Sequence, residues 1–214
     1  MNNIKLFVTV KKILTLERDL SYYICASYLL YFISLCMFNN NKSLIYIIQD
    51  IGQLFIYIIS VYIMTYNYGN MKSYIYYNFF TACISCIGMS LLDQINFLDK
   101  FIMKGSIINE WNYIHYLFFI IFLIFNLFVI FYNYYYCLSI FFIIKVIIIL
   151  CYTLISIIIT LINEKIVHIH HWYLCYCLMI LSCANTNFAQ TMHYIYLGIF
   201  IQGISIYSIS VLYD

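Results

Sequence analysis

Proline is absent from this sequence, and charged residues are almost as scarce. Asp, Glu, Lys and Arg make up 8% of the 214 residues, against roughly 25% in soluble domains. Hydrophobic residues make up 66%. A soluble fold needs polar side chains to wet its surface, so this composition excludes an ordinary soluble domain. The net charge of +2, with no basic run interleaved with aromatics, argues against a nucleic-acid partner.

Motifs of soluble enzymes and of secreted proteins are also missing. The chain has no Gly-rich phosphate loop and no GxSxG nucleophile elbow. Residues 1–19 mix Lys5, Lys11, Lys12 and Arg18 with apolar residues, and no small-residue cleavage site follows, so we expect no signal peptide. We predict that 1–19 form a basic interfacial segment on the membrane surface. The lack of Pro argues mildly against a transporter with paired broken helices.

Long apolar stretches fill the rest of the chain. They cover residues 20–38, 44–66, 73–92, 114–132, 138–162, 170–184 and 189–212. Most are near the twenty residues needed to cross a hydrocarbon core about 30 Å thick. The sixth is the shortest, and it could instead form one arm of a re-entrant hairpin. Membrane strands would need only about ten residues of alternating polarity. We therefore predict an all-α, polytopic transmembrane helical bundle of about seven spans, forming one domain over 20–212.

The connections carry the remaining polar residues. The longest, 93–113, has apolar residues at helical spacing and is a candidate interfacial helix. Counting Lys and Arg by the positive-inside rule favours a cytoplasmic N-terminus by five residues to four. The partners we expect are the lipid bilayer and other membrane proteins, in either an endomembrane or the plasma membrane.

Ionisable residues gather at one end of the predicted spans. Because spans alternate in direction, the same side of the membrane receives Asp50, Asp93, Glu110, His115, Glu164, His168, His170 and His171. The membrane centre excludes such groups, which explains why they lie at span ends but not why they share one side. A shared polar site is one interpretation, and solvation of separate loops is the other.

The sharpest local motif is His168-Ile169-His170-His171-Trp172. Neutral imidazole is a common ligand of zinc, iron and copper. On a helix His168 and His171 share a face, and His115, Asp50 or Asp93 would have to complete a metal site. The candidate metal ligands are His168, His170, His171, His115 and Asp93. The alternative is an interfacial histidine patch with Trp172 and Tyr173 in the headgroup layer, and we expect no cofactor unless zinc or iron binds there.

Other polar residues receive simpler predictions. Lys145 is expected to extend toward the nearer membrane interface. Asn126, and Gln202 with Ser205, should form hydrogen bonds between helices. The nine cysteines, including the Cys83-x-x-Cys86 pair, are interpreted as small packing residues rather than a disulfide framework.

The last part of the chain combines an H-x-H-H-aromatic start, a short span, a polar break and a Gly-containing span. It covers residues 168–207 and reads HIHHWYLCYCLMILSCANTNFAQTMHYIYLGIFIQGISIY. This stretch resembles the C-terminal membrane module of LCCL-domain-containing and related uncharacterised protist membrane proteins. Family members usually place Gly where Cys175 stands, and no LCCL domain is present. The resemblance implies a membrane module and brings no activity with it.

A weaker resemblance is to seven-span, zinc-dependent lipid amide hydrolases such as alkaline ceramidases. It would assign roles to Ser90, Asp93, His115, His168 and His171, with a zinc-bound water attacking an amide carbonyl. That family's C-terminal pair is spaced HxxxH, whereas this chain has HxHH. We predict a non-enzymatic interaction, scaffolding or transport-associated membrane component. The alternative is a metal-dependent membrane lipid hydrolase.

Overall fold

A computed structural model describes residues 2–38, 42–67, 75–92, 112–137, 140–162 and 171–207. This part of the chain forms seven α-helices and one π-helical turn, so the predicted all-α fold is confirmed there. They are α1 (Asn2–Phe38), α2 (Leu44–Tyr62), η1 (Ile63–Asn67), α3 (Ile75–Leu92), α5 (Tyr113–Cys137), α6 (Ile140–Ile162), α7 (His171–Leu181) and α8 (Asn187–Tyr207). The predicted interfacial helix at 93–113 lies almost wholly outside the described residues.

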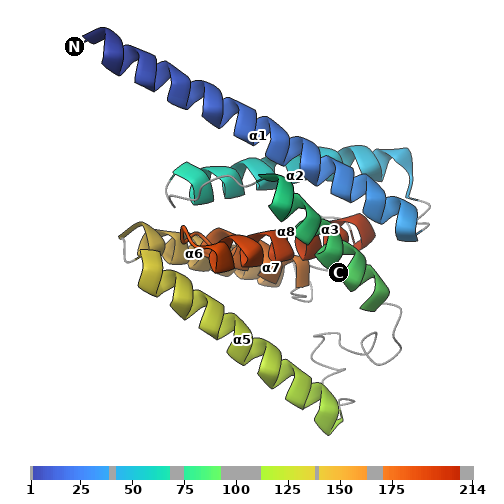
Figure 1. The fold of residues 1–214 in the computed structure, drawn as a ribbon. Helices are drawn as coiled ribbons and strands as arrows, with labels where there is room; N and C mark the ends of the chain where they lie inside the picture. Colours follow the sequence, from blue (N-terminus) through green and yellow to red (C-terminus); the bar gives the residue numbers. More distant parts are fainter. Residues whose placement is uncertain are drawn as a thin grey trace.

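The helices surround a central antiparallel pair, α7 and α8. Contacts join Trp172 to Phe200 and Met179 to His193, so α8 runs back along α7. Helices α1 and α3 also pack extensively on α8, and α2 lies beside α1. Figure 1 shows α5 and α6 lying close at one end and diverging from there, with α5 extending away from the centre of the bundle.

Four helical segments are long and apolar enough to cross a membrane. They are Glu17–Met37, Leu44–Thr65, Tyr113–Cys137 and Ile140–Ile158. The helices expected at 73–92, 170–184 and 189–212 also form, as α3, α7 and α8, but none qualifies by both length and apolarity. Helix α7 has only 11 residues, and α8 has 21 but carries several amide, hydroxyl and imidazole side chains.

Helix α1 is longer than the span predicted at its C-terminal end. It runs from Asn2 to Phe38 without interruption, because no Gly or Pro occurs along its 37 residues. Its N-terminal half extends beyond the other helices (Figure 1). Within this helix the apolar segment Glu17–Met37 lies close to the predicted span 20–38, and the placement of residues 1–19 on the membrane surface stays a prediction.

The more apolar helices of this bundle are the less buried ones. The outer faces of α5 and α6 leave many Ile, Leu and Phe side chains exposed, among them Leu150 and Leu154. Helix α8 is buried nearly along its whole length and holds polar residues in its interior. This is the pattern of a protein whose surroundings are apolar, since lipid accepts exposed hydrocarbon but no unpaired polar group.

Candidate functional site

The buried polar groups of α8 form the most developed polar arrangement in the described residues. We call the side chains of His193, Tyr196 and Ser205, together with the Ile204 carbonyl, the α8 seam. The three side chains are almost fully buried. Together these groups bond to α1, α5, α7 and Lys42, so α8 acts as the polar centre of the bundle.

His193 occupies the N-terminal end of the seam. Its Nδ1 lies 3.0 Å from the Met179 carbonyl oxygen of α7. Because a carbonyl only accepts, Nδ1 carries the proton and Nε2 is the acceptor. The Tyr23 hydroxyl of α1 then donates to Nε2 over 2.9 Å. Both ring nitrogens of a fully buried imidazole are therefore paired, which joins α1, α7 and α8.

A buried ion pair lies at the opposite end of the seam. Lys42 Nζ lies 2.8 Å from Asp50 Oδ2 and donates to the Ile204 carbonyl over 3.0 Å. Tyr31 donates its hydroxyl to the same carboxylate oxygen over 2.9 Å. The carboxylate and the ammonium side chains are only 3% and 11% exposed. A charge removed from water in this way needs such partners, and here they join α1, α2 and α8.

Hydroxyl and amide groups complete the connections of α8. Ser205 is hydrogen-bonded to Ser34 of α1, as expected for an interhelical polar residue. Tyr196 donates to the Asn126 side chain of α5 over 2.8 Å, so the prediction for Asn126 is also confirmed. These bonds tie both an inner and a peripheral helix to α8.

Helices α3 and α8 approach each other closely at Gly198. A Cβ atom built there would lie 2.4 Å from the Ala82 carbonyl oxygen and 2.9 Å from the Cys86 nitrogen of α3. Ser85 donates to the Ile195 carbonyl over 3.0 Å at the same crossing. Only Gly allows the two backbones this proximity, as in close helix packing within membranes.

The predicted metal ligands fall mostly outside the described part of the chain. Asp93, His168 and His170 lie in ranges that the structure does not describe, and His171 is placed only as the first residue of α7. His115 is buried, and its Nδ1 lies 2.6 Å from Asn112 Oδ1. The metal site stays a prediction.

Two further observations bear on that prediction. Among residues 2–38, 42–67, 75–92, 112–137, 140–162 and 171–207, no three His, Cys, Asp or Glu side chains come together as metal ligands would. Asp50, one of the three residues that could have completed the site, is paired with Lys42, whose opposite charge neutralises the buried carboxylate.

Several residues predicted at the membrane interface are buried in the protein. Lys145 was expected to reach the interface but is 2% exposed. Trp172 is fully buried against Tyr57 and Phe200, because the short helix α7 lies inside the bundle. Tyr173 is also buried and lies 2.6 Å from the Thr153 hydroxyl. Packing between helices holds all three side chains.

The sequence predicted a site at other histidines and none at His193, yet both ring nitrogens of His193 are hydrogen-bonded at the centre of the bundle. The sequence feature that could have indicated its role is a histidine inside the least apolar of the long segments, which also holds Gln190 and Gln202.

Comparison with known protein families, curated proteins and solved structures found no match. The resemblance of residues 168–207 to a membrane module therefore stays a prediction.

Proposed function

We propose that this chain is a seven-span membrane scaffold, a non-enzymatic component that holds helices in a fixed arrangement and offers its outer faces to lipid and to other membrane proteins. The single observation that carries the proposal is the pairing of the α8 seam. A scaffold gains from buried polar groups that satisfy one another, because such groups fix helix positions at every contact.

The seam supports a structural role more than a chemical one. The His193 imidazole is occupied at both nitrogens, and the Asp50 carboxylate is neutralised by Lys42. A general base or metal ligand needs a free lone pair directed at a substrate or ion. The bonding of these groups favours a part in assembly over a part in catalysis.

The proposed seven spans include three helices besides the four that qualify by length and apolarity. Helices α3, α7 and α8 are included in the proposed seven because they pack among the others, where neighbouring protein shields their polar groups from lipid. The antiparallel pair of α7 and α8 supports treating residues 168–207 as one membrane module, in keeping with the proposed resemblance.

Topology mapping tests the span number. Glycosylation tags placed before Met1 and beside Lys165 are expected on opposite sides of the membrane, because five spans separate them in the proposed arrangement. A third tag at the C-terminus is expected on the side of Lys165. Finding the first two tags on the same side would contradict the seven-span arrangement.

Metal content tests the scaffold against the alternative hydrolase. Elemental analysis of the protein purified in detergent without chelators is expected to find zinc and iron far below one ion per chain. The matched control is a variant with His168, His170 and His171 replaced by Gln. Near-stoichiometric zinc or iron that this variant loses would favour the metal-dependent lipid hydrolase instead.

A further inference from the structure

A second buried cluster lies apart from the α8 seam, where the end of α5 meets the break between α7 and α8. The Sγ atoms of Cys137 and Cys183 are 3.3 Å apart. Cys183 lies in the non-helical stretch that follows α7 and is 1% exposed, whereas Cys137 is only partly buried. The two thiols are hydrogen-bonded, and one of them has access from outside the core.

Lys145 of α6 directs its ammonium group to the same place. Its Nζ is buried and, among the residues that the structure describes, makes no hydrogen bond of ordinary geometry. Its charge lies close enough to the thiols of Cys183 and Cys137, and to the imidazole of His193, to interact electrostatically with each of them. Apolar residues surround the cluster, including Phe142 and Leu181.

Burial of this lysine needs a counter-charge. An ammonium removed from water is strongly destabilised unless it is paired. The imidazole of His193 is neutral and fully bonded, so it does not supply a negative charge. A thiolate shared between the two hydrogen-bonded cysteines does supply one, and a neighbouring lysine stabilises a thiolate over a thiol.

We propose that Cys137 and Cys183 form a reversible disulfide in response to hydroperoxides, and that Lys145 promotes it by stabilising the reacting thiolate. The disulfide would connect the peripheral helix α5 covalently to the break between α7 and α8. This role is independent of the scaffold proposal, because it depends only on the local cluster.

The chemistry uses one hydroperoxide for each disulfide. Peroxide reaches the pair beside the more exposed Cys137, and the thiolate on Cys183, which Lys145 stabilises, attacks it. An S–O bond forms, the O–O bond breaks, and the leaving alkoxide takes a proton to become an alcohol. The product is a sulfenic acid on Cys183. Cys137 then attacks that sulfur, the S–S bond forms, and hydroxide leaves with the remaining thiol proton as water. The sulfur atoms lose two electrons in total and the peroxide gains them.

Geometry permits the final bond with a small movement. A disulfide requires an S–S separation of about 2.05 Å, so the sulfurs must approach each other by little more than 1 Å. The adjacent connection is already ordered, because the Ala184 amide donates to the Asn133 side chain of α5 over 3.0 Å. The disulfide would reinforce a contact that exists in the reduced protein.

The test oxidises the purified full-length chain with dilute tert-butyl hydroperoxide and follows peptides by mass spectrometry. We expect a Cys137–Cys183 linkage that dithiothreitol reverses. Lys145→Met should slow its formation about tenfold or more, as expected when a thiol loses a stabilising cation, whereas Lys145→Arg should keep most of the rate. Cys83 and Cys86, three residues apart on α3, serve as an internal control pair and should link far more slowly.

Clear outcomes would overturn the proposal. One is the absence of the linkage at peroxide doses that oxidise the exposed Cys25 and Cys36. Another is a linkage whose rate is the same in wild type and Lys145→Met. If Lys145→Met fails to fold, the rates of disulfide formation at Cys137–Cys183 and at Cys83–Cys86 in the wild-type protein still test the proposal. Equal rates would show that the Cys137–Cys183 pair has no special reactivity.

Discussion

Helices α6 and α8 differ in both composition and position. Helix α6 is among the most apolar segments and is among the least buried, whereas α8 carries His, Gln and Ser and is buried nearly throughout. In a soluble protein the more apolar helix would occupy the core. The reversal indicates that hydrocarbon surrounds the bundle and that polar pairing, rather than hydrophobic burial, selects the central helix.

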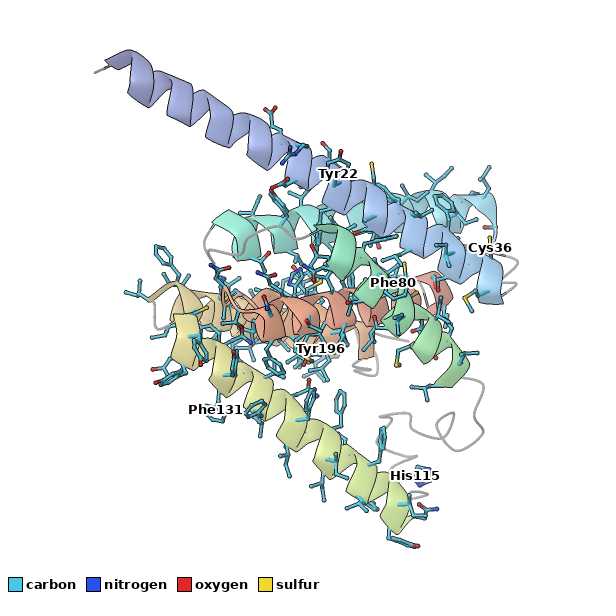
Figure 2. All side chains as sticks on the ribbon, in the orientation of Figure 1. Tyr22, Cys36, Phe80, His115, Phe131 and Tyr196 are labelled. Atoms are coloured by element: carbon cyan, nitrogen blue, oxygen red, sulfur yellow. The ribbon has the colours of Figure 1, made fainter. Side chains whose placement is uncertain are left out.

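The same contrast is visible in how each helix contacts its neighbours. Helix α8 is bonded through its seam to α1, α5, α7 and Lys42. Helix α6 has fewer such bonds, one being that of Thr153 to Tyr173 of α7. Figure 2 shows Tyr196 lying among the central helices, and Phe131 at the periphery on α5. Substitutions should therefore have large effects on α8 and small effects on α6.

The largest effect is expected at the buried ion pair. Asp50→Ala removes the carboxylate that lies 2.8 Å from the Lys42 ammonium and should destabilise the protein by roughly 3–5 kcal/mol. Thermal unfolding in detergent micelles measures the change. The double variant Lys42→Met/Asp50→Leu should recover a substantial part of it, because neither charge then remains buried alone. Equal losses in the single and double variants would show that the pair is not the cause.

Gly198→Ala should have the next largest effect. The added Cβ would lie 2.4 Å from a backbone oxygen of α3, so the two helices must separate. We expect a loss of about 3 kcal/mol, at the upper end of the usual range for overpacking. Gly88→Ala is the matched control, since its Cβ would have nothing within 4 Å and Ala favours the helix. A similar response at both positions would contradict the close approach of α3 and α8.

A pair of leucines compares the two helices directly. Leu197 of α8 is 1% exposed and Leu150 of α6 is 62% exposed. Leu197→Ala should destabilise the protein by about 2 kcal/mol, at the lower end of the range for core cavities, because lipid is as apolar as the protein interior. Leu150→Ala should change stability by less than about 0.5 kcal/mol. Unfolding of the two variants under identical conditions measures both values, and a larger effect at Leu150 would reverse the comparison.

The smallest of these effects is expected from a single hydroxyl. Tyr23→Phe removes the group 2.9 Å from His193 Nε2 and should destabilise the protein by about 1 kcal/mol. Tyr46→Phe, at an exposed position of α2, is the control and should be nearly neutral. Indistinguishable unfolding temperatures for the two variants would show that the Tyr23 bond contributes nothing measurable.

Sequence alone could identify the helices but not their order from surface to centre. The continuous apolar runs predicted α5 and α6 closely, because a span of hydrocarbon requires that many apolar residues. Asn126 and Ser205 were also predicted correctly as interhelical donors or acceptors. These predictions succeed because each depends only on the residues of one segment.

The partners of buried groups depend on segments far apart in the chain. Lys145 was expected to reach the interface, but it is buried and its charge interacts with the thiol of Cys183, 38 positions later. His193 lies 170 positions from Tyr23, and nothing in either local sequence indicates the pairing. The candidate metal ligands remain a sequence prediction, since Asp93, His168 and His170 fall outside the described ranges.

The reversal of apolarity and burial is tested most directly by labelling the unmodified protein in lipid vesicles with a lipid-soluble diazirine. Photolysis inserts the probe into side chains that contact hydrocarbon, and mass spectrometry locates it. The account predicts strong labelling at Leu150 and Leu154 of α6 and little or none along α8 from Ala189 to Ile204. Labelling of α8 as strong as that of α6, or protection of α6, would contradict the account.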